Sequence, residues 1–179
     1  MRRYILTGAP GAGKTAILRL LERRGHPVVE EAATDVIALA SAQGRSEPHR
    51  SPGFIDDILA LQQLRQARAD FAPAPAVFFD RSPVCTWALA AFLNYPASPA
   101  LRDEIDRIGR EGVYARRVFF IRNQGFVTPT DARRISFEES VRFEAVHAEV
   151  YARFGFSCLM VEPGPVGARA AAVEAGMTV

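Results

Sequence analysis

Gly8-Ala9-Pro10-Gly11-Ala12-Gly13-Lys14-Thr15 is the stretch of sequence that decides the fold. It matches G-x-x-x-x-G-K-[ST], the pattern of a phosphate-binding loop, in which glycines let backbone N–H groups turn inward around a phosphate. Lys14 is the only lysine among the 22 basic residues of the chain, so a compact ammonium stands where arginine is used everywhere else. The motif predicts a site for a nucleoside triphosphate, with ATP as the first candidate and GTP as the second.

The flanks of the loop are those that the motif requires, because such a loop binds phosphate between a strand and a helix. Residues 3–7 are a β-prone run, and apolar residues recur at helical spacing over 16–22. We expect Lys14 to reach the β- and γ-phosphates and the Thr15 hydroxyl to bind Mg²⁺. The nucleotide contacts are expected from Gly8, Ala9, Pro10, Gly11, Ala12, Gly13, Lys14, Thr15 and Ala16.

Composition limits the remaining possibilities. A chain of 179 residues with 49% apolar content can bury one good core, so we expect a single domain over 1–179. The net charge of +2 is small and the arginines are dispersed, which does not indicate a nucleic-acid partner. Cys85 and Cys158 lack metal-ligand spacing, and neither a signal peptide nor a membrane span is recognisable. These features predict a cytoplasmic protein and leave its oligomeric state open.

Strands and helices alternate along the rest of the chain. Further strands are predicted at 27–30, 76–79, 117–121 and 157–161, and helices at 31–42, 54–71, 84–93, 99–112, from 137 onward and at 166–175. The segment 43–53 reads as a polar, mobile loop. This alternation predicts an α/β fold of the P-loop NTPase type, a doubly wound five-stranded parallel sheet flanked by helices.

Two helix starts carry recognisable caps. Ser82 and Pro83 are predicted as the N-cap and first residue of one helix, and Ser136 with Glu139 forms a capping box at the start of a long one. The apolar residues expected on the inward face of that long helix are Phe137, Val141, Ala145, Ala148, Tyr151 and Ala152.

Polar residues follow several of the predicted strands directly. Ligands of such sheets bind at the carboxyl ends of the strands, where this chain has Glu30-Glu31, Asp80-Arg81 and Arg122 beside the phosphate loop. Glu30 and Glu31 are adjacent, so we expect only one of them to enter the site, with Glu31 preferred. The alternative is that these acids stabilise the start of the next helix.

The sequence resembles small P-loop kinases and predicted ATPases, of the AAA-type P-loop group, related to the nicotinamide-riboside kinase domain of the bifunctional NAD-biosynthesis regulator. The resemblance covers most of the chain and is carried by the phosphate loop, Val28-Val29-Glu30-Glu31-Ala32-Ala33, Gln62-Gln63, Phe78-Phe79-Asp80-Arg81, Asp131-Ala132-Arg133-Arg134 and Tyr151-Ala152-Arg153-Phe154-Gly155-Phe156. One departure is Asp35, where such sequences often have arginine.

The resemblance implies a kinase-like sheet in which the strand ending at Asp80 lies beside the strand of the phosphate loop. Asp80 would then bind Mg²⁺ through a water, or accept the proton of an acceptor hydroxyl, a role for which Glu30 and Glu31 compete. The alternative is an aspartate that caps the following helix, although Ser82 is already predicted at the cap position. Arg81 would meet substrate or phosphate, with a surface ion pair as the alternative.

The resemblance also bears on the rest of the site. Arg122, Arg133 and Arg134 bracket a segment whose composition suits a lid, and its arginines would stabilise the transferred phosphoryl group unless they simply face solvent. Gln62 and Gln63 are candidates for a base or sugar, although one of them is expected to face solvent. The adenine would lie at 162–165. His26, His49 and His147 form no constellation and are interpreted as surface or packing residues.

Two functions from different classes follow. The first is an ATP-dependent kinase that phosphorylates a hydroxyl of a small molecule, of the nucleoside or riboside type, with Lys14, Glu31, Asp80, Arg81, Arg133 and Arg134 as catalytic candidates. The second is an NTP-hydrolysing or NTP-binding switch that acts on a protein or lipid partner. Thr15 and Asp80 are the expected Mg²⁺ ligands in either case.

Overall fold

Five short strands form one parallel sheet in the computed structural model, which describes residues 1–71, 74–125 and 136–177. The strands are β1 (Arg2–Thr7), β2 (Val28–Val29), β3 (Ala76–Asp80), β4 (Arg117–Ile121) and β5 (Ser157–Val161). Their order is β2-β3-β1-β4-β5, and each pair is parallel. The residues of β3 are all buried, as expected of an apolar run in the middle of a parallel sheet. The predicted five-stranded parallel sheet is confirmed.

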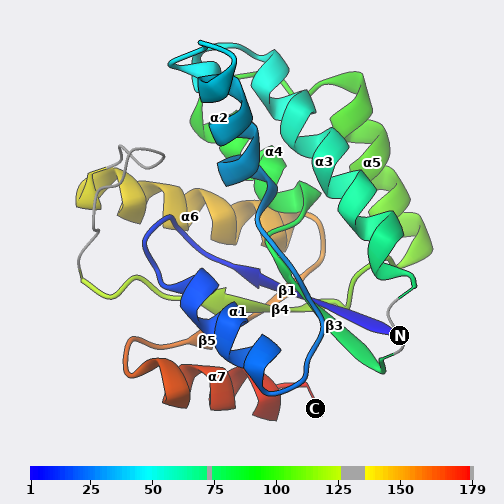
Figure 1. The fold of residues 1–179 in the computed structure, drawn as a ribbon, viewed down its shortest axis with the longest axis vertical. Helices are drawn as coiled ribbons and strands as arrows, with labels where there is room; N and C mark the ends of the chain where they lie inside the picture. The colour runs from blue at the N-terminus through cyan, green and yellow to red at the C-terminus, as the bar shows by residue number, and fades with distance from the viewer. Residues whose placement is uncertain (72–73, 126–135, 178–179) are drawn as a thin grey trace.

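Helices cover both faces of this sheet (Figure 1). They are α1 (Lys14–Arg23), α2 (Ala32–Ala42), α3 (Gly53–Ala69), α4 (Pro83–Phe92), α5 (Pro99–Glu111), α6 (Phe137–Arg153) and α7 (Val166–Ala175). α1 and α7 pack together on one face, where Ile17, Phe78 and Val173 share a core cluster. α3, α4, α5 and α6 cover the other face, and α2 packs against α3. The fold is doubly wound, with layers of helices on either side of the strands.

The strand order brings the polar strand ends together. β1 lies between β3 and β4, and Leu6 at its end pairs in register with Asp80. The chain leaves β1 toward the phosphate loop and leaves β3 toward Arg81, so both connections emerge at the same edge. This is the place where open α/β sheets bind ligands.

The inward face predicted for α6 is largely wrong. Phe137 and Val141 are 44% and 46% exposed, Ala145 and Ala152 are also exposed, Ala148 is half-buried, and only Tyr151 of the predicted set is fully buried. The residues that face the core are Ser140, Phe143, His147, Val150 and Tyr151. The face could not be recognised from apolar spacing because two of its members, Ser140 and His147, are polar and make hydrogen bonds in the interior.

Two local predictions also need correction. Ser82 occupies the N-cap position of α4 but makes no capping hydrogen bond, because its hydroxyl lies 2.9 Å from the Tyr151 hydroxyl instead. The predicted loop 43–53 contains a short 3₁₀-helix, Pro48–Arg50, in which Pro48 is buried. The capping box of α6 is present as predicted, with Ser136 and Glu139 bonded reciprocally. No helix among the described residues is long and apolar enough to span a membrane.

Candidate functional site

Backbone geometry explains why glycine is needed at two positions of the phosphate loop. Gly8 has φ 120°, and a Cβ atom built there would lie 2.3 Å from the carbonyl oxygen of Ile121 in β4. Gly13 has φ 87°, and a Cβ atom there would lie 3.0 Å from Nη1 of Arg169. Both conformations are strained for residues with a side chain. The loop therefore turns tightly between β1 and α1 while in close contact with β4.

The Lys14 ammonium lies across the loop and is buried. Its Nζ donates hydrogen bonds to the carbonyl oxygens of Gly8 at 3.0 Å and Ala9 at 2.9 Å. Burial, reinforced by the positive charge of Arg81, lowers the pKa of Lys14 to about 8, although nearby Asp80 and Glu31 oppose the shift. A phosphate beside Nζ would favour the protonated form, so anion binding and protonation of Lys14 are coupled.

Two side chains from distant helices also hold the loop. Ser140 of α6 donates to the carbonyl oxygen of Pro10 at 3.0 Å, and Arg169 of α7 donates to that of Ala12 at 2.8 Å. Sequence reasoning missed both residues. The only signal for Arg169 was a single basic residue in an alanine-rich helix, four residues before the buried Val173.

Asp80 lies directly opposite Thr15. Its Oδ2 atom accepts a hydrogen bond from Thr15 Oγ1 at 3.1 Å, while Oδ1 is buried and has no hydrogen-bond partner among the described residues. Burial and the charge of Glu31 raise the pKa of Asp80, and the charges of Lys14 and Arg81 only partly oppose this. An unpartnered carboxylate oxygen beside a hydroxyl is a fitting pair of hard ligands for Mg²⁺.

No group of three or more histidine, cysteine or acidic residues that could hold a metal occurs in the described part of the chain. In nucleotide sites, Mg²⁺ is usually held by one or two protein oxygens together with substrate phosphates. Thr15 Oγ1 and Asp80 Oδ2, 3.1 Å apart, fit that mode of binding.

The Arg81 guanidinium lies between the carboxylate of Glu31 and the neutral imidazole of His147. Its Nε forms an ion pair with Glu31, and its Nη1 lies 3.1 Å from Nε2 of His147. His147 Nδ1 lies 2.9 Å from the carbonyl oxygen of Phe143, so Nδ1 carries the proton and Nε2 accepts from Arg81. Burial and the charge of Arg81 hold the pKa of His147 well below its usual value. His147, interpreted from sequence as a surface or packing residue, is buried and contacts the site.

Arg81 also has an unusual backbone. Its φ of 75° lies in the left-handed region, which is costly for a residue with a side chain. The backbone N–H of Arg81 bonds to the carbonyl oxygen of Leu6, which fixes the turn to the end of β1. Strain of this kind persists where the surroundings over-determine it, and it is typical of functional sites.

Glu31 and Glu30 point in different directions. Burial opposes ionisation of Glu31, but the charges of Arg81 and Lys14 outweigh it and lower its pKa to about 2, with a further hydrogen bond from Thr34 at 2.8 Å. The Glu30 carboxylate instead forms an exposed ion pair with Arg19. Of the two acids, Glu31 alone is brought to Arg81.

The turn from β2 into α2 is fastened by Arg65 of α3. Its Nη1 donates to the carbonyl oxygens of Glu30 at 2.9 Å and Glu31 at 2.8 Å, and its Nη2 pairs with Asp35. Asp35 stands where the resembling sequences often have arginine, and here it pairs with Arg65, which has a structural role. The arrangement fixes the backbone that carries Glu31.

The remaining candidates differ in what the structure shows of them. Arg122 pairs with Glu144 at 2.7 Å and is 44% exposed, while Arg133 and Arg134 lie outside the described residues. Gln62 is buried and accepts a hydrogen bond from Thr86 at 2.8 Å. Gln63 is exposed and donates to Glu104 at 3.0 Å on α5, away from the phosphate loop. Only Gln62 of the two remains a candidate for substrate contact.

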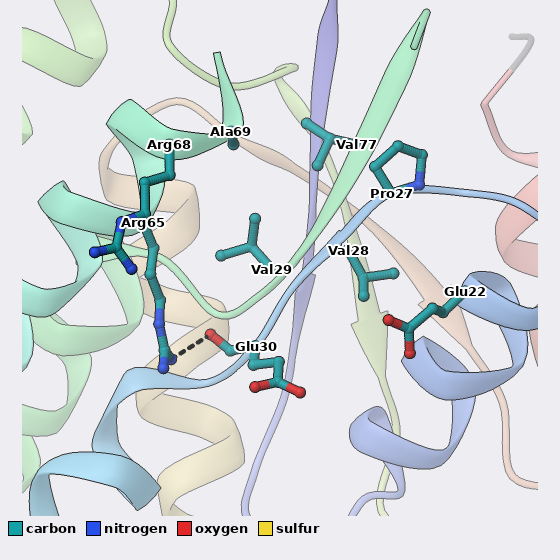
Figure 2. A pocket seen from close by; sticks show the side chains of 9 residues that line it. All are labelled: Glu22, Pro27, Val28, Val29, Glu30, Arg65, Arg68, Ala69 and Val77. Carbon is teal, nitrogen blue, oxygen red and sulfur yellow. Dashed lines mark hydrogen bonds between the residues drawn. The ribbon is translucent and has the colours of Figure 1, made fainter. Parts of the chain in front are cut away.

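Figure 2 shows a hollow of about 380 Å³ on the open side of β2, lined by residues of α1, β2, α3 and β3. Of the predicted site residues, only Glu30 lines it, and the dashed line marks the bond from Arg65 to the Glu30 backbone. The hollow is therefore separate from the groups at the phosphate loop.

Solved structures share the fold at low sequence identity. A deoxyadenosine kinase from M. mycoides with bound dATP matches with a TM-score of 0.64 and 14% identity, covering 99% of this chain and 100% of the other. The NadR protein in complex with NAD and AMP-PNP matches with a TM-score of 0.71 and 17% identity. That match covers 99% of this chain but 50% of NadR, so the chain spans about half of NadR.

Among curated proteins, none was found with significant similarity to the chain. Residues 3–169 match the AAA_28 family, described as an AAA domain, and the match spans the phosphate loop, Glu31, Asp80 and Arg169. Since it covers most of the sequence, the chain belongs to the AAA_28 family of P-loop AAA domains.

Proposed function

We propose that the protein is an ATP-dependent kinase that transfers the γ-phosphate of MgATP to a hydroxyl group of a small molecule of the nucleoside or riboside type. The observation that carries the proposal is the juxtaposition of two functional halves at one sheet edge. Lys14, Thr15 and Asp80 form a half suited to a nucleotide and its metal. Glu31 and Arg81 form a half that a nucleotide site alone does not require.

The nucleotide half accounts for the donor. Lys14 would leave the carbonyl oxygens of Gly8 and Ala9, at least in part, to bind the β- and γ-phosphates. Thr15 and Asp80 would hold Mg²⁺, which supplies neutralisation of the charge on the phosphate oxygens. Glycines let the backbone of the loop turn so that its N–H groups can face the phosphates.

The second half accounts for the acceptor. Glu31 stays ionised at neutral pH, so its carboxylate can accept a hydrogen bond from the acceptor hydroxyl and orient its oxygen toward the γ-phosphorus. Arg81, held by Glu31 and His147, presents a fixed guanidinium to the phosphoryl group or the acceptor. Because phosphoryl transfer has a loose transition state, positioning and charge neutralisation are the main contributions asked of the protein.

Two findings of the comparison support this function. The fold is shared with a deoxyadenosine kinase and with NadR, whose structures were solved with dATP and with AMP-PNP respectively. A NadR complex with NR matches equally well, with a TM-score of 0.71. These likenesses favour a nucleoside or riboside as the acceptor, and Arg133 and Arg134 remain candidates for a lid over the nucleotide.

The test is ATP consumption with and without a panel of nucleosides, ribosides and phosphorylated sugars. We expect one class of acceptor to accelerate ADP formation strongly, with stoichiometric appearance of a phosphorylated product. Lys14→Ala should abolish nucleotide binding and turnover, whereas Arg110→Ala, an exposed change on α5, should alter neither. Hydrolysis that no acceptor changes would instead support an NTP-hydrolysing switch and count against the kinase.

A further inference from the structure

Arg169 is buried beside the phosphate loop without an opposite charge. It lies in α7, and only 3% of the residue is exposed. Its Nη1 donates to the Ala12 carbonyl oxygen at 2.8 Å, and its Nη2 donates to that of Arg122 at 2.9 Å. The guanidinium therefore reaches from α7 to the backbone of the loop and lies close to Gly13, where an added Cβ atom would be 3.0 Å from Nη1.

All known partners of this guanidinium are neutral. Within residues 1–71, 74–125 and 136–177 it makes no ion pair, and its Nε is buried without a hydrogen-bond partner. Arg81, the other buried arginine at the site, is paired with Glu31. Burial lowers the pKa of Arg169, but a guanidinium remains protonated in proteins. A buried charge with only carbonyl partners costs free energy of folding.

The unpaired guanidinium lies where an anion is expected to bind. The loop residues Ala12 and Gly13, next to Arg169, belong to the motif that surrounds a polyphosphate chain. A cation already desolvated acts through a low local dielectric constant, so it attracts a nearby anion more strongly than an exposed arginine does.

We propose that Arg169 is a positioning residue whose missing counter-charge is the polyphosphate of the bound nucleotide. The uncompensated charge makes the nucleotide-free protein less stable, and a bound phosphate removes this destabilisation by pairing with the guanidinium. Arg169 also ties α7 to the loop through the Ala12 carbonyl oxygen. The inference rests on the proposed function only in requiring a nucleotide at the phosphate loop, and it does not depend on the acceptor.

A purely structural role of Arg169 predicts the opposite change in the stability of the nucleotide-free protein when the residue is removed. If Arg169 served only to tie α7 to the loop through carbonyl hydrogen bonds, removing it would lower the stability of the nucleotide-free protein. If it is an uncompensated charge, a neutral side chain of similar length should leave that stability unchanged or increase it, while nucleotide affinity falls. The two roles therefore differ in the sign of one measurement.

The experiment compares Arg169→Met and Arg169→Lys with the wild-type protein. We measure the Tm without ligand and the Kd for MgATP and for pyrophosphate, which has phosphates but no base. For Arg169→Met we expect an equal or higher ligand-free Tm and a Kd raised about 10- to 100-fold for both ligands. Arg169→Lys keeps the charge, so its Kd should stay within a few-fold of wild type.

Arg117→Met is the matched control. Arg117 also donates to a backbone carbonyl, that of Gly176 just after α7, at 3.0 Å, but it lies at the start of β4, the opposite end from the phosphate loop. Its removal should leave both Kd values unchanged.

Four outcomes would overturn the inference. Two concern Arg169→Met itself: failure to fold, or a lower ligand-free Tm with unchanged Kd. The other two are an Arg169→Lys Kd as weak as that of Arg169→Met, and a loss of affinity confined to MgATP and absent for pyrophosphate. Wild-type protein that binds no MgATP would defeat the proposed function as well, whereas wild-type binding with an unaffected Arg169→Met defeats this inference alone.

Discussion

Asp80 carries a buried oxygen that makes no hydrogen bond to any described residue, and the unpaired atom makes the aspartate costly for folding. Asp80→Asn should lower kcat about 10²- to 10⁴-fold, since it removes the charge that we propose to hold Mg²⁺ together with Thr15. The Kd for nucleotide should change much less, and the Tm without ligand should not fall. Steady-state kinetics and thermal unfolding measure these quantities.

The control for this change is Asp103→Asn on the exposed side of α5. It removes a carboxylate of the same size far from the phosphate loop, and we expect wild-type kcat and Tm. Full activity in Asp80→Asn would eliminate Asp80 as a metal ligand and as a proton acceptor.

His147 makes the stability of the protein sensitive to acid. Its pKa in the folded state is well below 6.5, the value expected in the unfolded chain, so the unfolded state binds more protons as the pH falls below 6.5. The free energy of unfolding should therefore decrease from about pH 6.5 downward. Urea unfolding between pH 5 and 7 should show a flatter pH dependence in His147→Gln, because an amide does not titrate.

His49→Gln provides the comparison, since His49 is exposed on the 3₁₀-helix. This variant should keep the wild-type pH dependence. The opposite result, a slope lost in His49→Gln and kept in His147→Gln, would contradict the neutral imidazole that accepts a hydrogen bond from Arg81.

Residues of the site differ in how far the sequence could reveal them. Lys14, Thr15 and Asp80 were predictable because they belong to a motif or end a recognisable strand. Ser140 and His147 were not predictable, because their contacts arise only when α6 packs over the phosphate loop and over Arg81. His147 and Arg81, for example, are more than 60 residues apart in the sequence. Single polar residues on a helix carry no signal of such a contact.

At the scale of elements, the phosphate loop depends on one close approach to β4. Gly8→Ala should abolish MgATP binding, because the added Cβ would lie 2.3 Å from the carbonyl oxygen of Ile121 and would force the loop out of position. Isothermal titration of purified, folded protein measures the loss, and circular dichroism checks that the sheet persists.

Gly44→Ala separates this clash from backbone strain alone. Gly44 also has positive φ, 80°, but nothing lies within 4 Å of its added Cβ. We expect a cost of about 1–2 kcal/mol in the free energy of unfolding and unchanged nucleotide affinity. Equal affinities in the two variants would show that the contact of Gly8 with β4 is not needed.

Helices and strands were predictable to different degrees. The bounds of β4, β5 and α7 agree with the sequence patterns, because turn residues flank each apolar run. β2 is shorter than predicted, since its polar neighbour Glu30 belongs to the turn that Arg65 holds. The inward face of α6 was predicted wrongly because some of its buried residues are polar, and these polar residues belong to the site.

For the molecule as a whole, alternation of strands and helices predicted the parallel sheet, and the neighbouring positions of β1 and β3 came from the resemblance. The distribution of charge could not be predicted. Lys14, Arg81 and Arg169 converge on the loop from α1, the end of β3 and α7, against Asp80 and Glu31. Only the packing of α7 beside α1 brings Arg169 to this place.

The single lysine allows this charged site to be probed in the intact protein. With a pKa of about 8, Lys14 is about half neutral at pH 8, whereas a lysine with the usual pKa of 10.5 would be almost fully protonated. An amine-reactive reagent should therefore modify Lys14, the one lysine of the sequence, about 15-fold more slowly at pH 6.5 than at pH 8. Peptide mass spectrometry measures the modification of Lys14 and of the N-terminal amine of the protein under test.

MgATP should protect Lys14 by pairing its ammonium with phosphate, while the N-terminal amine of the protein under test serves as an internal reference that nucleotide does not protect. In urea the protection should disappear, and Lys14 should react with the pH dependence of an ordinary lysine. Equal labelling of the folded protein with and without MgATP would place the nucleotide away from Lys14. The phosphate loop would then not be the nucleotide site, and the roles proposed for Asp80 and Arg169 would fail with it.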